Sequence, residues 1–276
     1  MARIHSTAIV DPSAQLDDDV EIGPYAVIGP GVCLGAGSRV LAHATVDGPA
    51  TLGRNNVVHP HAAIGGPPQD KKYRGEPTTL EIGDGNTFRE CVTVNRGTTQ
   101  DSGITRIGHR NWIMAYVHVA HDCRIGSDTI LANTTNLGGH VELGDWVILG
   151  GCTQVHQFCK IGPHAMTGTG TIVLHDIPPY VMASGNPSAA HGLNTEGLRR
   201  RGFEPETIAM LRRAYRTLYR SELTLQQARS ALDEQLRGLL DGPPLPPPTT
   251  PAGLAAPDAL RLLTDFLGRV ERGIVR

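Results

Sequence analysis

The sequence predicts a mainly β protein, in which a parallel β-helix of hexapeptide repeats is followed by a small all-α subdomain. Three observations lead to this fold class. An aliphatic side chain recurs every six residues over most of the chain, aromatic residues make up only 4% of a sequence with 33 glycines, and the repeat stops where helical spacing begins. A narrow prism of short strands has no room for rings, which accounts for the scarcity of aromatic residues.

The hexads begin at the N-terminus. Counting in sixes from Ile4 to Ile64 meets an aliphatic residue at every step; the register returns at Ile82 and, after a slip of one residue, runs from Ile107 to Ile161. Glycine often follows the aliphatic residue, and a small residue stands four places after it. A period of six fits neither an α-helix nor a two-sided strand, whereas it fits short strands joined by tight turns that glycine permits. Three hexads form one triangular coil of about 18 residues, so residue i lies beneath residue i+18, about 4.8 Å away.

Two stretches without hexads interrupt the β-helix, which we expect to span residues 1–190. They lie near 66–79 and near 95–105. Loops that leave a rigid scaffold often carry function, and a tolerated insertion is the alternative. We expect both stretches to be excursions from the coil.

The last part of the chain, residues 191–276, is expected to form an α-helical domain. Residues 205–220 and 224–240 place apolar side chains on one face of a helix. Residues 241–257 include seven prolines and predict an extended linker. A last helix is predicted over residues 258–272.

The charge distribution and the cysteines indicate which kind of partner and which cellular compartment to expect. The formal net charge is -2, which does not indicate nucleic-acid binding, but residues 192–276 hold 13 Lys and Arg against 10 Asp and Glu, so an acidic partner is expected there. Five cysteines form no C-x-x-C pair, and an odd number suits a reducing compartment. No signal peptide and no long apolar run is present in the sequence. We expect a cytoplasmic protein without membrane insertion.

The 18-residue coil places several polar residues on one outer strip. His121 stands two places after the interior Val119 and therefore points outward, beneath Gly139, which in turn lies beneath Gln157. Asp122 lies beneath His140 by the same count. The residues that converge on this strip, with His118 just before them, are His121, Asp122, Gly139, His140, His156 and Gln157.

This strip is suited to general-base catalysis. A histidine beside a carboxylate accepts a proton near neutral pH, and a glycine one coil above can present a backbone N–H to an oxyanion. A solvated or interface histidine is one alternative, and a zinc site like that of the β-helical γ-class carbonic anhydrases is another. Cys123 and Cys159 occupy small interior positions, so packing is expected for them rather than metal ligation or nucleophilic attack.

Several local motifs make the resemblance specific. The chain resembles the hexapeptide acyltransferases, whose β-helix is left-handed, and in particular the UDP-N-acetylglucosamine O-acyltransferases of lipid A biosynthesis. The segments that carry this resemblance are His118-Val119-Ala120-His121-Asp122-Cys123, Leu137-Gly138-Gly139-His140-Val141, Val155-His156-Gln157-Phe158-Cys159, Gln69-Asp70-Lys71-Lys72-Tyr73, Pro178-Pro179-Tyr180, residues 194–203 and residues 272–276. Two features depart from the family pattern: the proline-rich stretch 241–257 is longer, and Gly66-Pro67-Pro68 precedes the Gln-Asp pair.

The resemblance implies a reaction and roles for residues. Members transfer an (R)-3-hydroxyacyl group from acyl carrier protein to the 3-hydroxyl of UDP-N-acetylglucosamine, without cofactor, metal or covalent intermediate. His121 would be the general base, Asp122 would orient its imidazole, and the Gly139 N–H would stabilise the oxyanion. Implied substrate-binding residues are Asp70, Lys72, His118, His140, His156, Gln157, Asn194, Glu196, Arg200 and Arg201. Thr169 occupies the position of the family's acyl-length ruler, and its intermediate side chain suggests chains somewhat shorter than the longest accepted.

The resemblance also implies a homotrimer with sites between adjacent prisms. Arg212, Arg216 and Arg220 form a basic stripe that fits the acidic carrier protein, and a solvated helix face is the alternative. Three other functions remain open at this point: the related lipid A N-acyltransferase, a metal-dependent enzyme like the γ-carbonic anhydrases, and a purely structural β-helix.

Overall fold

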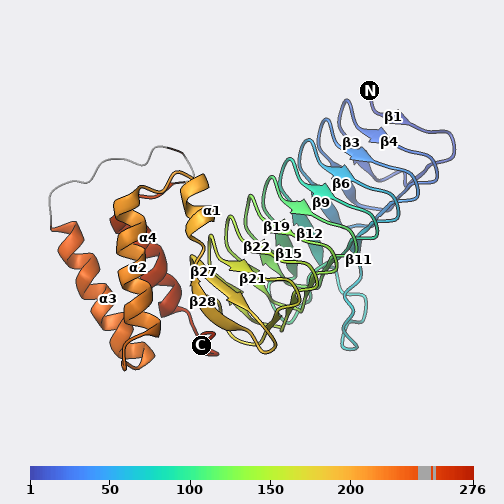
Figure 1. The fold of residues 1–276 in the computed structure, drawn as a ribbon. Coiled ribbons are helices and arrows are strands. Elements are labelled where there is room, and N and C mark those ends of the chain that lie inside the picture. The colour runs from blue at the N-terminus through green and yellow to red at the C-terminus, as the bar shows by residue number, and fades with distance from the viewer. Residues whose placement is uncertain (242–249, 251–252) are drawn as a thin grey trace.

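The computed structural model describes residues 1–241, 250 and 253–276. Short parallel strands form three sheets, which are the three sides of a left-handed triangular prism, and four helices follow at its C-terminal end (Figure 1). The strands pair in parallel except for β27 and β28, which form an antiparallel hairpin on the last coil. The predicted fold class, a left-handed β-helix of hexapeptide repeats with an α-helical C-terminal part, is confirmed.

The three sides are named here A, B and C in the order in which the chain visits them. Side A consists of β1 (Arg3–Ile4), β4 (Glu21–Ile22), β7 (Arg39–Val40), β10 (Val57–Val58), β13 (Thr87–Phe88), β16 (Trp112–Ile113), β19 (Ile130–Leu131), β22 (Ile148–Leu149), β25 (Met166–Thr167), β27 (Val181–Ser184) and β28 (Ala189–Leu193). Side B consists of β2 (Ile9–Val10), β5 (Val27–Ile28), β8 (Thr45–Val46), β11 (Ala63–Gly66), β14 (Thr93–Asn95), β17 (His118–Val119), β20 (Asn136–Leu137), β23 (Gln154–Val155) and β26 (Ile172–Val173). Side C consists of β3 (Gln15–Leu16), β6 (Val32–Leu34), β9 (Ala50–Leu52), β12 (Thr79–Ile82), β15 (Ile104–Ile107), β18 (Arg124–Ile125), β21 (Glu142–Leu143) and β24 (Lys160–Ile161).

The register of the strands follows the predicted coil length. Arg3 pairs with Glu21, one 18-residue coil later. The spacing between paired residues exceeds 18 at two places, where Val57 pairs with Thr87 and where Thr87 pairs with Trp112. The chain leaves the coil between β11 and β12, over residues 67–78, and between β14 and β15, over residues 96–103. These two segments are called here the first and the second excursion.

The interior of the prism holds the aliphatic and the small residue of each hexad. Ile22 and Ala26 are buried, as are their counterparts in later coils. Phe88 occupies an aliphatic position and is fully buried. The interior is therefore filled in the way the repeat predicts.

The role predicted for the glycine after each aliphatic residue was wrong. Except for Gly65, these glycines do not have a left-handed backbone; the positive φ occurs two residues later, mostly at non-glycine residues such as Asp128 (59°) and His140 (61°). A Cβ added to Gly35 would lie 2.6 Å from the carbonyl carbon of Gly53 in the next coil. Glycine is required there because adjacent coils approach closely, and not because the turn needs its conformational freedom.

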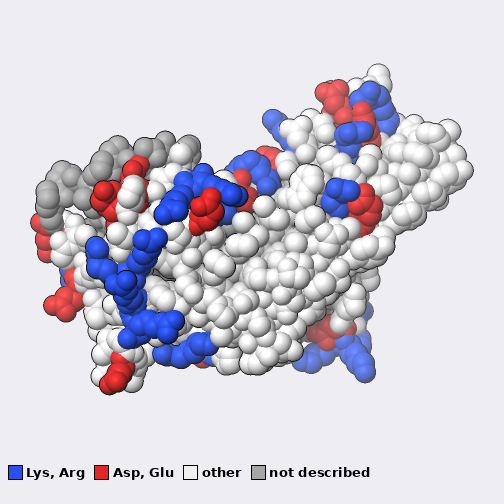
Figure 2. Space-filling view, in the orientation of Figure 1, with Lys and Arg blue, Asp and Glu red and all other residues white. Residues whose placement is uncertain are grey.

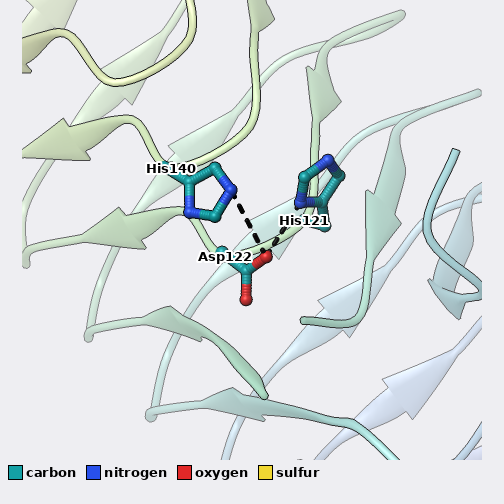
Figure 3. Close-up of side chains that lie close together, drawn as sticks. All are labelled: His121, Asp122 and His140. Carbon is teal, nitrogen blue, oxygen red and sulfur yellow. Dashed lines mark hydrogen bonds and ion pairs between the residues drawn. The ribbon is translucent and has the colours of Figure 1, made fainter. Parts of the chain in front are cut away.

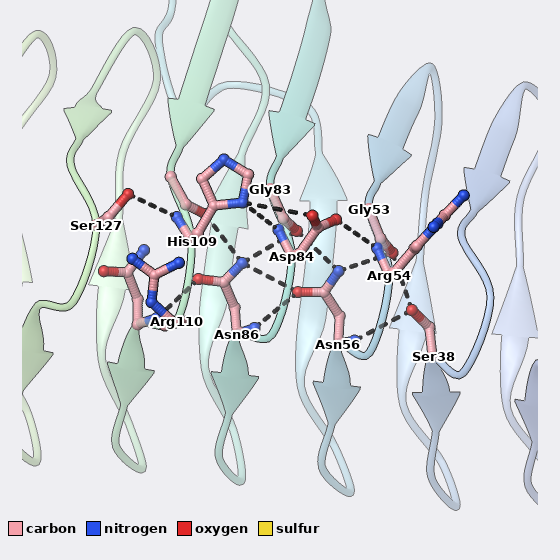
Figure 4. A network of polar contacts seen from close by, with 12 residues as sticks. Ser38, Gly53, Arg54, Asn56, Gly83, Asp84, Asn86, His109, Arg110 and Ser127 are labelled. Atoms are coloured by element: carbon pink, nitrogen blue, oxygen red, sulfur yellow. Dashed lines mark hydrogen bonds and ion pairs between the residues drawn. The ribbon is translucent and has the colours of Figure 1, made fainter.

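A column of polar side chains runs inside the prism at the corner between sides C and A (Figure 4). Asn56, Asn86 and Asn111 occupy the small-residue position of three successive coils and are buried. Asn86 Nδ2 donates to Asn56 Oδ1 at 3.0 Å and also to two backbone carbonyls, while Asn86 Oδ1 accepts from the Asn111 backbone N–H at 2.9 Å. Ser38 and Thr129 continue the column at its two ends. The column joins the coils that flank both excursions.

The helices are α1 (Thr195–Arg200), α2 (Pro205–Tyr219), α3 (Leu225–Leu240) and α4 (Ala256–Gly268). Pro205 occupies the first turn of α2, and Thr224 forms a capping box with Gln227 at the start of α3. Leu211, Leu232 and Leu260, one from each of these longer helices, are buried in a second core that also includes Tyr180.

The C-terminal predictions need two corrections. The last helix ends at Gly268 rather than at residue 272, because the chain turns back to the β-helix, where the Val275 N–H donates to the Asp176 carbonyl at 2.9 Å. In the stretch 241–257, residues 242–249 and 251–252 lie outside the described residues, and Ala256 and Pro257 already belong to α4. No helix in the described ranges is long and apolar enough to cross a bilayer.

Candidate active site

His121 and Asp122 lie in the turn between β17 and β18, at the corner between sides B and C. His121 Nδ1 lies 2.8 Å from Asp122 Oδ2. The His121 side chain is 16% exposed, whereas the Asp122 side chain is fully buried. The backbone N–H of His140 donates to the His121 carbonyl at 3.0 Å, which places the next coil directly above this pair.

Gly139 lies against the His121 ring. A Cβ at Gly139 would be 2.7 Å from Cε1 and 2.9 Å from Nε2 of His121. Any side chain at position 139 would therefore displace the ring or close its free edge. Glycine keeps this side of the imidazole open.

The second excursion holds the carboxylate of Asp122. The Thr98 backbone N–H donates to Oδ1 at 2.9 Å, and the Thr98 hydroxyl donates to Oδ2 at 2.6 Å. Burial opposes ionisation, but the hydrogen bonds from His121 and Thr98 outweigh it, so the pKa of the Asp122 carboxyl is lowered. The ionised carboxylate accepts a hydrogen bond from the Nδ1–H of His121, which leaves Nε2 as the nitrogen with the free lone pair.

His140 lies above this pair and points toward the same carboxylate (Figure 3). Its Nε2 is 3.8 Å from Asp122 Oδ2, and its Nδ1 is 3.2 Å from Asp101 Oδ2. Phe158, one coil further on, stacks on the His140 ring with the centroids 4.4 Å apart. Both histidines are thus held by a carboxylate and by a neighbour in the adjacent coil.

Two hollows meet at His121. One has a volume of about 690 Å³ and includes the first excursion in its wall. Its lining residues are Gln69, Asp70, Lys71, Lys72, Gln100, Asp101, His121, His140, Gln157 and Phe158. The other, called here the side-B groove, measures about 480 Å³ and runs along the outer face of side B.

The predicted residues His118 and His156 line the side-B groove. His118 Nδ1 is 2.7 Å from the Thr93 hydroxyl, and burial, with the nearby His121, lowers the pKa of the His118 imidazole. His156 Nδ1 lies 3.0 Å from the Gln157 carbonyl, to which Arg272 also donates. The structure therefore brings nine of the predicted residues around one position: His121, Asp122, Gly139, Asp70, Lys72, His118, His140, His156 and Gln157.

Four predicted residues lie elsewhere in the single chain. Asn194 caps α1, where its Oδ1 accepts from Gly197 and its Nδ2 donates to the His164 carbonyl, both at 3.1 Å. Glu196 and Arg200 pair with each other on α1 at 3.0 Å. Arg201 lies over the Trp146 ring at 5.3 Å, beside a hollow of about 600 Å³ at the corner between sides C and A.

Thr169 lies at the third corner, between sides A and B. It is exposed and follows β25, three residues before β26 begins at Ile172 on side B. Ile172 and Leu174, which come shortly after it, line the groove. The side chain of Thr169 is not among the lining residues of the groove.

Three residues of the site were missed by the sequence reasoning. Thr98 and Asp101 belong to the second excursion, where the 18-residue rule does not apply, and Thr105 accepts a hydrogen bond from the Asp122 backbone N–H at 2.8 Å. The available signal was the interruption itself, which begins with a run of polar residues after Asn95. The pattern predicted an excursion there but not the direction in which its side chains point.

Other sequence predictions concern residues away from this position. Cys123 and Cys159 are buried, and burial raises the pKa of their thiols to about 12 and about 11, which agrees with packing rather than reactivity. Arg212 and Arg216 are exposed on α2, and Arg220, which caps the C-terminus of this helix, is exposed as well. Figure 2 shows Lys and Arg side chains gathered over α2 and the neighbouring α1.

The β-helix of hexapeptide repeats, together with the family match, places the chain in the class of bacterial hexapeptide transferases. The family described as bacterial transferase hexapeptide (six repeats) matches residues 104–139, and the family described as UDP N-acetylglucosamine O-acyltransferase, domain 2, matches residues 176–275.

Full-length relatives narrow the class. The acyl-[acyl-carrier-protein]–UDP-N-acetylglucosamine O-acyltransferases of Thiobacillus denitrificans and Herminiimonas arsenicoxydans are 55% and 53% identical to the chain, with complete coverage on both sides. The solved structure of LpxA from Acinetobacter baumannii matches with a TM-score of 0.90 and 45% identity over 99% of both chains. The chain belongs to the acyl-[acyl-carrier-protein]–UDP-N-acetylglucosamine O-acyltransferase family.

Proposed function

We propose that the chain transfers an (R)-3-hydroxyacyl group from acyl carrier protein to the 3-hydroxyl of UDP-N-acetylglucosamine, the first step of lipid A biosynthesis. The observation that carries this function is the His121–Asp122 pair, which opens onto two hollows in a chain of this family. One hollow suits a polar substrate and the other an extended chain. The pair lies where the two meet.

His121 Nε2 takes the proton of the acceptor hydroxyl while the oxygen attacks the thioester carbonyl. The ionised Asp122 carboxylate stabilises the imidazolium that forms, and the Gly139 N–H donates to the oxyanion. The new C–O bond forms, the C–S bond breaks, and the imidazolium returns its proton to the departing sulfur. The transfer is direct, without a covalent acyl-enzyme, a metal or a cofactor.

The two hollows divide the substrates between them. Lys72 pairs with the phosphates of the nucleotide, and Asp70, His140 and Gln157 position the sugar in the larger hollow. The acyl chain lies along the side-B groove past His118 and His156, and Thr169 limits its length near the far end. The basic stripe on α2 receives the acidic carrier protein.

We further propose that three chains form a ring. Side A carries an outward apolar strip on successive coils, formed by Trp112, Ile130, Ile148, Met166 and Met182. Trp112, Ile130 and Met182 are 44%, 38% and 39% exposed. Side B of the same prism carries the groove. A strip and a groove on different sides form a heterologous contact, and a triangular prism closes such contacts into a ring of three.

This arrangement also supplies the residues missing from the single chain. In the ring, Asn194, Glu196, Arg200 and Arg201 of one copy complete the nucleotide site of its neighbour. Residues 1–190 then provide the reacting groups, and residues 191–276 provide the contacts to the carrier and the nucleotide. We place the reaction in the cytoplasm, where both substrates are available.

The test offers purified protein UDP-N-acetylglucosamine together with hydroxyacyl carrier proteins of graded chain length, and follows the acylated nucleotide by mass. We expect transfer, with a preferred length below the longest in the series. The absence of product with every donor, under conditions where a related enzyme works, would refute the activity.

Two variants test the mechanism and the ring. His121→Ala is expected to lose most of the activity while keeping the mass of the assembly, and near-normal turnover would refute the assigned base. Ile130→Asp places a charge in the apolar strip and is expected to lower the mass measured by light scattering. A single-chain mass for the unmodified protein would exclude the ring.

A further inference from the structure

We propose that His121, Asp122 and His140 form a binding site for a divalent transition-metal ion with a preference for Zn²⁺, and that an ion bound there blocks acyl transfer. The ion is an inhibitor in this proposal and takes no part in the reaction. The binding stands on the geometry alone, whereas the inhibition rests on the proposed function of His121.

The three side chains offer a suitable set of ligand atoms (Figure 3). Two imidazoles and one carboxylate are ligands that Zn²⁺ accepts, at about 2.0–2.2 Å from the ion, so two ligand atoms of one tetrahedral ion lie about 3.3–3.6 Å apart. Here Asp122 Oδ2 is 2.8 Å from His121 Nδ1 and 3.8 Å from His140 Nε2, and all three ligand atoms lie within 4.8 Å of one another. A shift of the rings by less than about 1 Å brings all three within bonding distance.

The groups around these ligands are those that support a metal site. A ligating histidine usually donates its second ring N–H to a carboxylate, and a ligating carboxylate is itself hydrogen-bonded. His140 Nδ1 faces the Asp101 carboxylate at 3.2 Å, and Asp122 accepts two hydrogen bonds from Thr98. Both outer partners come from the second excursion.

The contact between His140 and Asp122 points to a cation. When Nδ1 of a neutral His140 donates to Asp101, the lone pair of Nε2 faces a carboxylate oxygen at 3.8 Å. Two acceptors in this arrangement repel each other unless positive charge lies between them. A metal ion bound to both ligand atoms supplies that charge.

The site also has an open side. It faces the hollow of about 690 Å³, so a water molecule can complete a tetrahedron around three protein ligands. The His121 and His140 side chains are both 16% exposed. An ion can therefore reach them from solvent, while the surrounding residues still hold both rings in place.

Binding at Nδ1 removes the base. In the metal-free pair the His121 proton is on Nδ1 and faces Asp122, and Nε2 has the lone pair. An ion that takes the Nδ1 lone pair of the neutral ring requires the proton to move to Nε2. The ring then has no lone pair for the acceptor hydroxyl, and the Asp122 oxygen is occupied by the ion.

The binding experiment uses the full chain, stripped with a chelator, and titrates Zn²⁺ against a chromogenic indicator and Co²⁺ by visible absorption. We expect one ion per chain, and a Co²⁺ spectrum of a four-coordinate site. His140→Asn is expected to abolish this binding, and Asp101→Asn to weaken it by about 10- to 100-fold, because the orienting carboxylate is lost. His5→Asn, at the far end of the prism, is the matched control and should keep the affinity.

Two results would overturn the proposal. If the unmodified protein binds no more Zn²⁺ than His140→Asn, no metal site exists beside Asp122. If the affinity is lost in His5→Asn and kept in His140→Asn, the ion binds at the far end of the prism and not beside Asp122.

The activity arm separates this proposal from the proposed function. Free Zn²⁺ is set with a metal buffer, because the product thiol of the carrier also binds zinc, and product is counted as acylated nucleotide. We expect inhibition with the same midpoint as binding, reversed by EDTA. Binding without inhibition would overturn the inhibitory role, whereas absent transfer in metal-free protein would overturn the proposed function and leave the binding result unaffected.

Discussion

Replacing Gly139 by alanine tests the assignment of the reacting position most directly. The added Cβ would lie 2.7 Å from His121 Cε1. Carbon atoms in favourable contact are about 3.5 Å apart, so the ring must move by about 0.8 Å. Because His121 Nδ1 is hydrogen-bonded to Oδ2 of the buried Asp122 at 2.8 Å, this movement also strains or breaks that hydrogen bond.

The expected loss follows from this displacement. A misplacement of about 1 Å at a reacting group lowers the rate by about 10²-fold, which corresponds to ~2.7 kcal/mol of transition-state stabilisation. We expect Gly139→Ala to lower kcat/KM for acyl transfer by about 10²-fold. Folding should be preserved, because the contact is with a partly exposed side chain rather than with the backbone of another coil.

The control occupies the same place in another hexad. Gly151, like Gly139, stands two residues after the aliphatic residue, and a Cβ there would meet only the Asn133 carbonyl at 3.5 Å. Gly151→Ala should therefore keep normal kinetics. Equal activity of Gly139→Ala and Gly151→Ala, with both proteins folded, would show that the His121 edge does not face the reacting atoms.

Three further predictions concern the support of the site and of the fold. Thr98→Val keeps the backbone donor to Asp122 but removes the hydroxyl donor that helps to lower the pKa of this carboxyl, so that pKa should rise. Because the ionised carboxylate supports the base, the acidic limb of the kcat/KM profile should move to higher pH. Thr98→Ser should restore the profile, and an unchanged profile would assign Thr98 to folding alone. Asn86→Ala leaves buried donors and acceptors unpaired and should lower the free energy of unfolding by about 3 kcal/mol. The Tm of this variant should be lower than that of Asn133→Ala, an exposed control. Equal Tm values would contradict a stabilising role of the polar column. Burial, with the nearby positive charge of Arg201, lowers the pKa of His164 from 6.5 to about 3, so below pH 6.5 the unfolded chain binds a proton that the folded chain does not. The free energy of unfolding should therefore fall by ~1.4 kcal/mol for each pH unit below 6.5. His164→Phe should remove this dependence on pH, and an identical dependence in the variant would refute the assignment.

The coil and the central pair could be predicted because they obey one rule. The period of six fixes which side chains point inward, and the 18-residue coil places Gly139 above His121 and His140 above Asp122. Both inferences need only counting, since every coil repeats the same backbone path. The sequence therefore reveals most of the prism and the core of the site.

The rest of the site depends on segments that do not repeat. Thr98 and Asp101 belong to the second excursion, whose path is set by tertiary contacts such as the Arg96 guanidinium, which donates to the Gly65 carbonyl at 2.9 Å. No period relates position 98 to position 122. Their contact could be seen only in the folded chain.

The turn geometry was misread for a different reason. Glycine is common where a left-handed backbone is needed, so its position after each aliphatic residue suggested the turn. In this fold the close approach of coils selects glycine at that position, while residues such as Asp122 and His140 accept the left-handed conformation. Two physical requirements select the same residue type, and sequence alone cannot separate them.

The polar column of Asn56, Asn86 and Asn111 has a consequence for how this protein can change. The chain departs from the prism twice, and after each departure an asparagine meets the one below it and fixes the row at which the chain returns. A return one residue out of step would lose this match. The excursions can therefore gain or lose residues during evolution while the coils of the prism keep their register. Residues of the excursions that contact substrate can change in this way without displacing His121.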